Sequence, residues 1–360
     1  VSQVLNLELK SSNMELDEVT VNARAIDENV KGIEMSVNKI DIKTIRKIPA
    51  LLGEVDLVRA IQLLPGVSTV GEGASGFNVR GGGVDQNLVL LDDAPVYNSS
   101  HLFGFFSVFN PDAVKDVKLY KGGIPAQYGG RASSILDVKM KEGNAKKLEV
   151  NGGIGVIFSR LSIEAPIVKD KASFIVAARR SYIDVLAKPF LTGNNANSKF
   201  SFYDLTAKVN YTINTKNTVF MSGYFGRDVF GTGFGFDWGN TTLTTRWNHV
   251  FSNKLLLNAT AFYSNYDYML DSDIENKRPN DAFKWTSNIE NLSIKPDFTY
   301  YIRPDNTISF GGQLLTYDFT PGKANATSNG EKREFGQANK QGVEASAYVG
   351  HDWKINSRLT

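Results

Sequence analysis

Residues Gly66 to Asn144 read GVSTVGEGASGFNVRGGGVDQNLVLLDDAPVYNSSHLFGFFSVFNPDAVKDVKLYKGGIPAQYGGRASSILDVKMKEGN. Three short apolar runs lie in this stretch, Asn87–Leu91, Val114–Tyr120 and Ser134–Met140, and each is bounded by Gly, Pro, Asn or Asp. Runs of about five to seven residues with such borders are typical of short β-strands. The stretch therefore predicts a compact domain built around a small sheet.

The segment before this stretch predicts one helix over residues 44–64, which would pack against the core of the small domain. Four apolar residues recur there at nearly helical spacing, and Pro65 ends the pattern. The recurring residues are Leu51, Val55, Val58 and Leu63.

After the small domain, about ten long strands are expected over 213 residues (360 − 147). In residues 203–211 and 255–263 one face is apolar over about nine residues, whereas strands of soluble proteins usually span about five or six. Tight connections alternate with longer polar ones, as in outer-membrane β-barrels. The tight ones are 166–171, 213–217, 252–254, 303–306 and 355–358, and the longer ones are 181–199, 228–240, 271–282 and 321–341. The pattern predicts a membrane barrel rather than a soluble sandwich.

Four motifs follow in fixed order within the opening stretch: FNVRGG at 77–82, VLLDDAPV at 89–96, FNPDAV at 109–114, and KGG leading to YGGR at 121–131. Together they closely resemble the plug domain of TonB-dependent outer-membrane receptors, in the form found in Bacteroidota. The resemblance is strong over residues 45–145 and weaker before them. It extends to the remaining residues only through the strand pattern.

The resemblance implies a mostly β fold, with a small α+β plug domain inside a large transmembrane antiparallel β-barrel. Such plugged barrels have about 22 strands, of which about ten would fall in this chain. The expected domains are the last strand or linker of a preceding domain (1–15), a TonB-box-like segment (16–23), the plug (24–147) and the N-terminal part of the barrel (148–360). Because a half-barrel would expose an unpaired edge to lipid, we expect the chain to be part of a longer protein.

The TonB-box-like segment has alternating apolar and polar residues between polar flanks. In the family this box binds TonB, which acts with an inner-membrane energising complex. An extended, β-branched segment on a tether can offer its backbone for such strand addition. The alternative is an ordinary edge strand. The residues of the segment are Leu16, Asp17, Glu18, Val19, Thr20 and Val21.

Arg80 and Arg131 each stand beside glycines, where backbones pack closely. A buried arginine needs a carboxylate partner, and Asp92, Asp93 and Asp137 are available. We expect ion pairs that join the plug to the barrel wall, involving Arg80, Asp92, Asp93 and Arg131. The family resemblance implies the same, since plug arginines there face barrel carboxylates.

Residues 97–106 mix aromatic, amide and hydroxyl side chains in a loop. Exposed aromatic residues suggest a binding surface at the plug apex. The expected substrate-facing residues are Tyr97, Asn98, His101, Phe103 and Phe105. In the alternative interpretation, Phe103, Phe105 and Phe106 belong to the plug core.

Composition excludes several classes of site. Lys plus Arg is 40 and Asp plus Glu is 38, so the net charge of +2 gives no case for a nucleic-acid partner. The absence of Cys excludes disulfides, zinc ribbons and Cys nucleophiles, and the three His residues are far apart. The glycines of residues 71–76 formally match a dinucleotide fingerprint, but no strand precedes them and no helix follows. We expect no enzymatic activity, no cofactor and no metal site.

The resemblance implies an outer-membrane receptor that imports an extracellular nutrient into the periplasm, energised through TonB. The N-terminus and plug would lie on the periplasmic side, and the barrel would contact outer-membrane lipid. A surface lipoprotein or other subunits of an outer-membrane complex are further candidate partners. The alternative is a receptor-derived scaffold subunit of an assembly or secretion complex, with a permanently closed plug. Siderophore, glycan and peptide all stay open as substrates.

Overall fold

The computed structural model describes residues 36–48, 55–71, 76–192, 198–231, 234–272 and 281–355, all of which belong to one compact unit, Ile33–Thr360. The TonB-box-like segment and residues 1–15 lie outside the described residues. Following the expectation above, we refer to residues 36–144 as the plug. The large sheet that follows is called the wall.

A five-stranded sheet in the order β1-β8-β9-β4-β5 forms the plug. The strands are β1 (Val37–Asp41), β4 (Asn87–Leu91), β5 (Ala94–Pro95), β8 (Val114–Tyr120) and β9 (Ser134–Met140). The three strands expected from the apolar runs are confirmed with their bounds. β4 and β9 run parallel, and the other pairs are antiparallel.

Two short helices pack their apolar residues into the core of this sheet, α2 (Ile42–Ile45) and α3 (Leu57–Gln62). The expected single helix over residues 44–64 is therefore wrong. Asp56 is extended (φ −106°, ψ 124°), and its side chain accepts from the Arg59 amide at 3.0 Å, so it begins a new helix as an N-cap. The core shared by helices and strands includes Ile45, Leu57, Ile61, Val117, Leu119, Leu136 and Val138.

Several short elements lie within the plug, and two more, α4 (Ile183–Ala187) and η3 (Lys188–Phe190), lie in the connection between the wall strands that end at Ser181 and begin at Lys199. Those of the plug are β2 (Val67–Thr69), β3 (Phe77–Val79), η1 (Val84–Gln86), β6 (Ser100–His101), η2 (Leu102–Gly104) and β7 (Phe106–Ser107). Among the described residues, no helix is long and apolar enough to cross a membrane.

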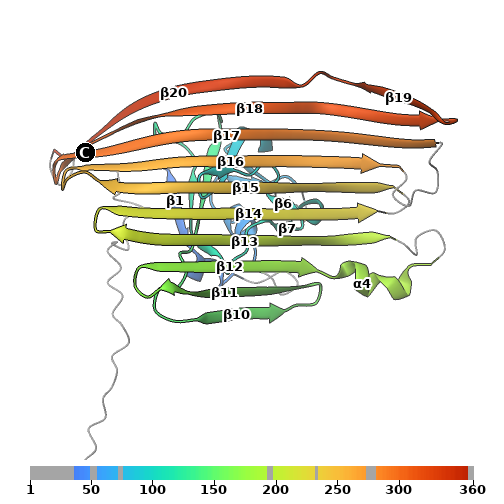
Figure 1. Cartoon of the computed structure of the whole chain (residues 1–360), viewed down its shortest axis with the longest axis horizontal. Helices are drawn as coiled ribbons and strands as arrows, with labels where there is room; N and C mark the ends of the chain where they lie inside the picture. Colours follow the sequence, from blue (N-terminus) through green and yellow to red (C-terminus); the bar gives the residue numbers. More distant parts are fainter. Residues whose placement is uncertain are drawn as a thin grey trace, which may run out of the picture. The chain divides into compact units, whose positions relative to one another are not determined.

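The wall is an antiparallel sheet of eleven strands (Figure 1). Its strands are β10 (Glu149–Ile154), β11 (Phe158–Val168), β12 (Ala172–Ser181), β13 (Lys199–Asn214), β14 (Asn217–Gly231), β15 (Gly235–Val250), β16 (Leu255–Asp271), β17 (Asp281–Arg303), β18 (Asn306–Ser328), β19 (Glu331–Gly336) and β20 (Lys340–Trp353). β19 and β20 both pair with β18, on successive parts of its length. This arrangement agrees with the expectation of about ten strands.

Two expected long loops, residues 228–240 and 321–341, are instead mostly strand. In the first, β14 continues to Gly231 and β15 begins at Gly235. The second is a hairpin. β18 continues to Ser328, and β19 begins at Glu331. Asn329 (φ 51°) and Gly330 (φ 82°) make the turn between them. Two left-handed residues of this type are typical of a tight hairpin, and the Asn-Gly pair is its usual sequence signal.

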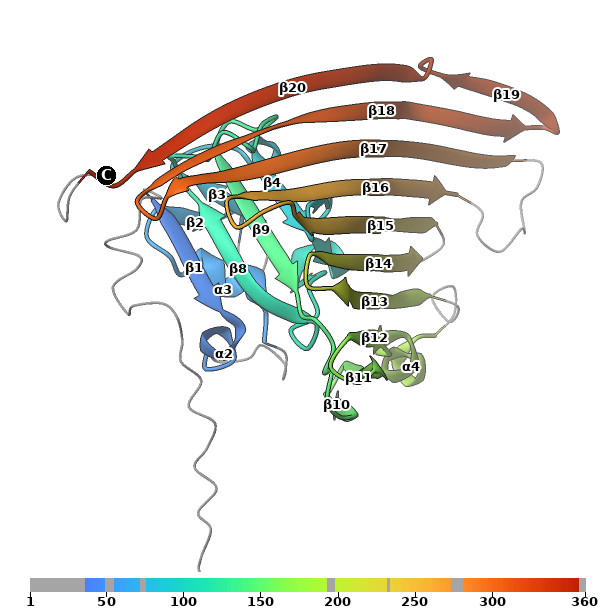
Figure 2. The ribbon, with the colours of Figure 1, turned by 60° about the vertical axis from the view of Figure 1, so that its left-hand side comes forward.

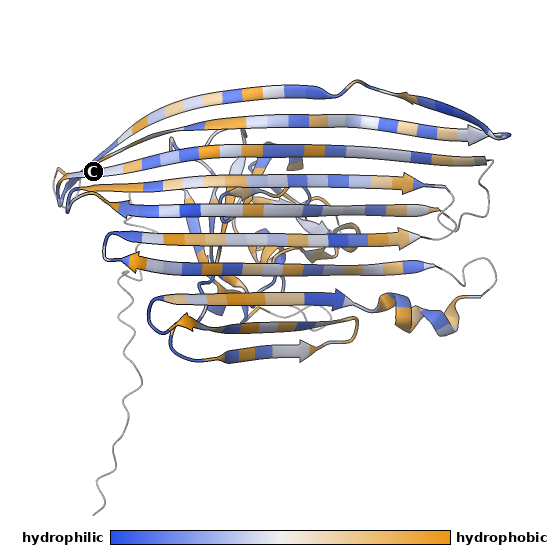
Figure 3. Cartoon of the chain, viewed as in Figure 1, coloured by the Kyte–Doolittle hydropathy of each residue, from blue (hydrophilic) through white to orange (hydrophobic). Residues whose placement is uncertain are grey.

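The wall buries polar side chains and exposes apolar ones. On β13, Thr206 and Lys208 are 3% and 4% exposed, whereas Leu205 and Val209 are 46% and 40% exposed. The same alternation follows the long strands in Figure 3. Figure 2 shows the plug strands on the side toward which the wall curves. A polar inner face against the plug and an apolar outer face are what strands facing lipid require.

Candidate functional site

The first contact between plug and wall is centred on His101, which is 1% exposed. Its Nδ1 lies 2.6 Å from an Asp228 carboxylate oxygen on β14, and its Nε2 lies 3.2 Å from an Asp204 oxygen on β13. Arg179 on β12 pairs with Asp204 at 2.8 Å and donates to the Ser107 carbonyl at 2.9 Å. We call His101, Arg179, Asp204 and Asp228 the His101 cluster.

Protonation of His101 suits this cluster. Burial by itself would lower the pKa of His101, but the Asp228 carboxylate, followed by Asp204, outweighs burial and raises the pKa above its ordinary value of 6.5. The protonated ring can donate from both nitrogens, and the Leu102 amide donates to the second Asp228 oxygen at 2.7 Å. The ring also stacks on Phe202, with centroids 4.4 Å apart. The cluster thus joins the plug to three wall strands.

The second contact uses Asp92 and Asp93, in the turn between β4 and β5. Both residues are left-handed, with φ values of 47° and 78°. Asp92 pairs with Lys208 at 2.9 Å, and Asp93 pairs with Arg246 on β15 and with Lys139 at 2.6 Å. Burial by itself would raise the pKa of Asp93, but Lys139 and Arg246 outweigh it and hold that pKa well below its usual range. Asp92, Asp93, Lys208 and Arg246 are the Asp92–Asp93 cluster.

The third contact is centred on Asp112 of the FNPDAV motif. Asp112 is 4% exposed. Its carboxylate lies between Arg46 of the plug, at 2.9 Å, and Arg160 of β11. Nearby in the chain, Phe106 is 2% exposed, with its ring centroid 6.2 Å from that of Phe202 on the wall. Charged and apolar contacts therefore both close the plug against the wall.

The structure places Arg80 and Arg131 away from these contacts. Arg80 donates to the Ser36 hydroxyl at 3.0 Å, and Arg131 donates to the Gly130 carbonyl at 2.7 Å, both at exposed positions. Within the described parts of the chain neither arginine reaches a carboxylate, so their expected role in ion pairs with the wall is corrected. The physical reason is that both lie in exposed glycine-rich turns, where water solvates the guanidinium. The wall supplies the cations instead, as Arg160, Lys208 and Arg246.

Replacing Arg80 or Arg131 by alanine is expected to change the free energy of unfolding of the plug by less than about 0.5 kcal/mol, as for most exposed side chains. Urea titration of the full-length protein in detergent measures this change. A loss of 2 kcal/mol or more in either variant would restore the original expectation.

The expected apex residues Tyr97 and Asn98 also contact the wall. The Tyr97 hydroxyl donates to Asn291 on β17, and the Asn98 carbonyl accepts from the Asn240 side chain at 2.7 Å. Burial raises the pKa of the Tyr97 phenol above its ordinary value of 10.0, so the phenol stays a donor at neutral pH. These two residues therefore fix the apex loop in place.

The remaining apex residues divide into buried and exposed groups. His101 as a substrate-facing residue is wrong, because two wall carboxylates bind its ring inside the His101 cluster. Phe103 and Phe105 are 56% and 51% exposed, so of the three phenylalanines in the alternative core interpretation only Phe106 is buried. The aromatic face that a ligand can reach is therefore that of Phe103 and Phe105.

Sequence reasoning missed the wall side of these contacts. Asp204 and Lys208 stand on the polar face of the strand predicted over residues 203–211, where charged residues opposite an apolar face are a usable signal. Asp228 lies on β14, inside the segment predicted as a loop over residues 228–240, and Arg246 lies on β15, for which no alternating pattern was predicted. Asp112 belongs to a quoted motif but had no role assigned to its carboxylate.

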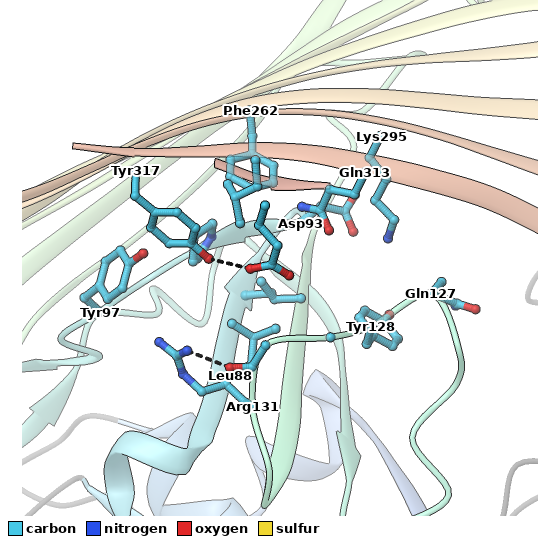
Figure 4. A pocket seen from close by; sticks show the side chains of 16 residues that line it. Leu88, Asp93, Tyr97, Gln127, Tyr128, Arg131, Phe262, Lys295, Gln313 and Tyr317 are labelled. Atoms are coloured by element: carbon cyan, nitrogen blue, oxygen red, sulfur yellow. Dashed lines mark hydrogen bonds between the residues drawn. The ribbon is translucent and has the colours of Figure 1, made fainter. Parts of the chain in front are cut away.

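Two open pockets lie between plug and wall. One, of about 470 Å³, is lined by Asp93 and Lys139 of the plug and by Arg246, Lys295 and Asp297 of the wall, among others. The balanced charges suit attachment of the plug better than binding of an ion of one sign. A smaller pocket of about 70 Å³ adjoins it, and Figure 4 shows plug and wall side chains meeting there. The labelled residues include Tyr97, Tyr128, Arg131, Phe262, Lys295 and Tyr317.

Comparison with known proteins identifies the plug. The family model of the TonB-dependent Receptor Plug Domain matches residues 29–134. No curated protein matches the chain significantly.

Several solved structures share the fold. The "Copper transporter OprC" matches with a TM-score of 0.66 and 13% identity, over 89% of this chain and 53% of that one. The siderophore receptor PirA from Acinetobacter baumannii matches with a TM-score of 0.61 and 14% identity, over 90% and 55%. The outer membrane transporter YddB from Escherichia coli matches with a TM-score of 0.61 and 11% identity, over 89% and 55%. The chain thus spans about half the length of these proteins. It carries a TonB-dependent receptor plug domain together with an antiparallel sheet of the kind found in the barrels of TonB-dependent receptors.

Proposed function

We propose that the protein is an outer-membrane receptor that binds an extracellular nutrient and imports it into the periplasm, energised through TonB. The observation that carries this proposal is a plug domain bound to the polar inner face of a sheet whose outer face is apolar. Three charged contacts close the plug against the wall, so opening a path requires work on the plug. An outer membrane has no nucleotide energy source, and a periplasmic partner would supply that work.

The segment Leu16–Val21 is the proposed handle for TonB. Its position ahead of the plug and its alternating, β-branched sequence suit strand addition to a sheet edge. In this proposal the plug and N-terminus lie on the periplasmic side. The order of motifs in residues 77–131 supports the Bacteroidota form of these receptors, and outer-membrane lipid and a surface lipoprotein are proposed as further partners.

The test removes Leu16–Val21 from the full-length receptor in its own host. Fitness in competition with the parent strain under limiting nutrient is expected to fall to that of a strain lacking the receptor, while the amount of receptor in the outer membrane stays unchanged. A matched pair refines the result: Val19→Pro removes a backbone donor needed for strand addition, whereas Val19→Thr keeps a β-branched residue.

The second candidate is the scaffold subunit with a permanently closed plug. The buried Asp204, Asp228 and Asp92 carboxylates favour it, because each is paired across the contact between plug and wall. Unchanged fitness in the deletion and in Val19→Pro would contradict import and support this candidate. Loss of fitness in Val19→Pro but not in Val19→Thr would support import.

A further inference from the structure

Aromatic rings from plug and wall gather where β14 ends and β15 begins. The plug residue Phe103 lies edge-on to Phe230, with centroids 5.0 Å apart, and 4.9 Å from Trp238. It also stacks over Phe236 at 6.2 Å. Phe236 and Trp238 contact each other at 4.7 Å. We call Phe230, Phe236 and Trp238 the aromatic site, and Phe103 partly fills it.

The backbone of Phe103 is in an unfavourable conformation. Leu102 and Phe103 both have positive φ, at 50° and 57°. Non-glycine residues adopt this region at a cost, and they keep it only where their surroundings hold them there. The surroundings are the His101 cluster on one side, where the Leu102 amide donates to Asp228, and the aromatic site on the other. Yet 56% of Phe103 stays exposed, so its ring is open to an incoming group.

The aromatic site contains a buried hydrogen-bond donor without an acceptor. Trp238 is 3% exposed, and its Nε1 has no partner among the residues that the structure describes. Buried donors of this kind are rare and call for an explanation. A ligand that carries an acceptor and lies against this indole would satisfy the donor.

Charge at this end of the wall favours an uncharged ligand. The ring-bearing and amide residues that face the plug here on β13 to β16 are Phe200, Phe202, Phe230, Phe236, Trp238, Asn240, Tyr266 and Tyr268. The charged inner residues next to these positions on β13 and β14 are Asp204 and Asp228, which are bound by Arg179, by His101 and by the Leu102 amide. The cations Lys208, Arg227 and Arg246 of these strands are already paired with carboxylates, so they offer little counter-charge to a strongly anionic ligand.

We propose that Phe103 occupies the place of a ligand ring, and that the ligand displaces it. The ligand class is a small molecule with an uncharged ring face and a hydrogen-bond acceptor, which would stack on the aromatic site and accept from the Trp238 indole. This deepens the proposed receptor function and rests on it. Displacement of Phe103 relaxes the Leu102–Phe103 turn, which is adjacent to His101, so occupancy of the site is transmitted to the contact that closes the plug.

The test uses the direction of the change in affinity, because replacing a residue that only contacts the ligand would weaken binding. Because Phe103 competes with the ligand, Phe103→Ala is expected to tighten binding by about three- to tenfold, the scale of one aromatic pair. The full-length receptor in detergent is titrated calorimetrically with 4-nitrophenyl β-glucoside, a neutral probe with a ring face and acceptors. Phe251→Ala is the matched control, since Phe251 is 48% exposed and directly follows β15 at the end opposite to the aromatic site, and the affinity of this variant should equal that of the parent. Unchanged or weaker binding in Phe103→Ala overturns the proposal.

Trp238→Phe tests the donor, because it keeps a ring and removes the N–H. Binding of the probe is expected to weaken about three- to tenfold, as for loss of one hydrogen bond. Unchanged affinity in this variant, or no binding of any probe to parent and Phe103→Ala alike, overturns the proposal. Titrations with cellobiose, which has only sugar rings, and with benzamide, which has an aromatic ring, then show which kind of ring binds the aromatic site.

The outcome is separable from that of the import test. Phe103→Ala can fail to tighten binding while removal of Leu16–Val21 still abolishes the fitness advantage. In that case the displacement of Phe103 by the ligand is wrong, and the import proposal stands. If Phe103→Ala tightens binding but the removal has no effect, the ligand site is supported without TonB-driven import.

Discussion

Replacing His101 by alanine is expected to lower the free energy of unfolding of the plug by about 3–5 kcal/mol, the cost of removing one partner from a buried charged network. The substitution leaves Asp228 and Asp204 buried, with 2% and 3% exposure, and Asp228 loses the ring nitrogen at 2.6 Å. Arg179 still pairs with Asp204 at 2.8 Å, so the larger part of the loss comes from Asp228.

Urea titration of the full-length protein in detergent can follow the plug alone. The 360 residues contain no Cys, so within them Lys115→Cys is the one site for a fluorophore, which then reports on plug strand β8. His351→Ala is the control, because His351 is an exposed histidine of β20 that bonds Asn306 at 2.9 Å, far along the chain from the plug. Equal titration midpoints for parent and His101→Ala would show that the cluster contributes nothing to plug stability.

The pH dependence distinguishes a charged His101 from one that only fills space. Its pKa is raised in the folded protein, so its stabilising contribution is complete below the ordinary value of 6.5 and is lost as pH rises through the raised value. The stability difference between the parent and His101→Gln should therefore shrink on the alkaline side. The groups that face the ring are Asp228, Asp204, Arg179 and Tyr224. A pH-independent difference would mean that the ring acts by packing on Phe202.

Local patterns in the sequence predicted the elements whose cause is local. The strands Asn87–Leu91, Val114–Tyr120 and Ser134–Met140 have the expected bounds because turn-forming residues flank each apolar run. The apolar outer face of residues 203–211 follows from a period of two. The helix over residues 44–64 failed because α2 ends at Ile45 and Asp56 begins a new helix as its N-cap, and the turn at Asn329-Gly330 was overlooked despite its signal.

Partners across the contact between plug and wall could not be predicted in the same way. Asp92 and Asp93 were expected in ion pairs that join the plug to the wall, but the only cations predicted for these pairs were Arg80 and Arg131. Their cations stand 116 and 153 positions away, at Lys208 (208 − 92) and Arg246 (246 − 93). Such pairing depends on strand register in the wall and on the rotation of the plug against the wall. Neither can be predicted from the sequence of a short segment.

Replacing Lys208 by methionine is the other change expected to have a large effect, with a loss of about 3–5 kcal/mol in plug stability. Met keeps most of the apolar stem, so packing changes little. The buried Asp92 carboxylate, however, loses a cation at 2.9 Å. The Met140 carbonyl also loses the Lys208 donor at 3.1 Å.

Combining Lys208→Met with Asp92→Asn should recover most of that loss. Asn carries no charge that could be left unpaired. In the parent the Met140 amide donates to Asp92 at 3.0 Å, and the side-chain oxygen of Asn can accept the same bond. Asn also tolerates the left-handed φ of 47° at this position. Replacing both members of a buried ion pair by neutral groups is often nearly neutral for stability. The same urea titration gives the coupling energy from the four variants, and additive losses would contradict a direct interaction.

The outcome of this cycle bears on what the ion pair does under the proposed import function. If the double variant is as stable as the parent, the pair cannot be retained for stability alone. Its charges would instead make one orientation of the plug against β13 more favourable than others, since a rotated plug would leave both Asp92 and Lys208 buried and unpaired. A plug that must leave its place and return to it needs that discrimination. The double variant should then be stable at rest and slow to recover a closed plug after import, whereas Lys208→Met should be unstable throughout.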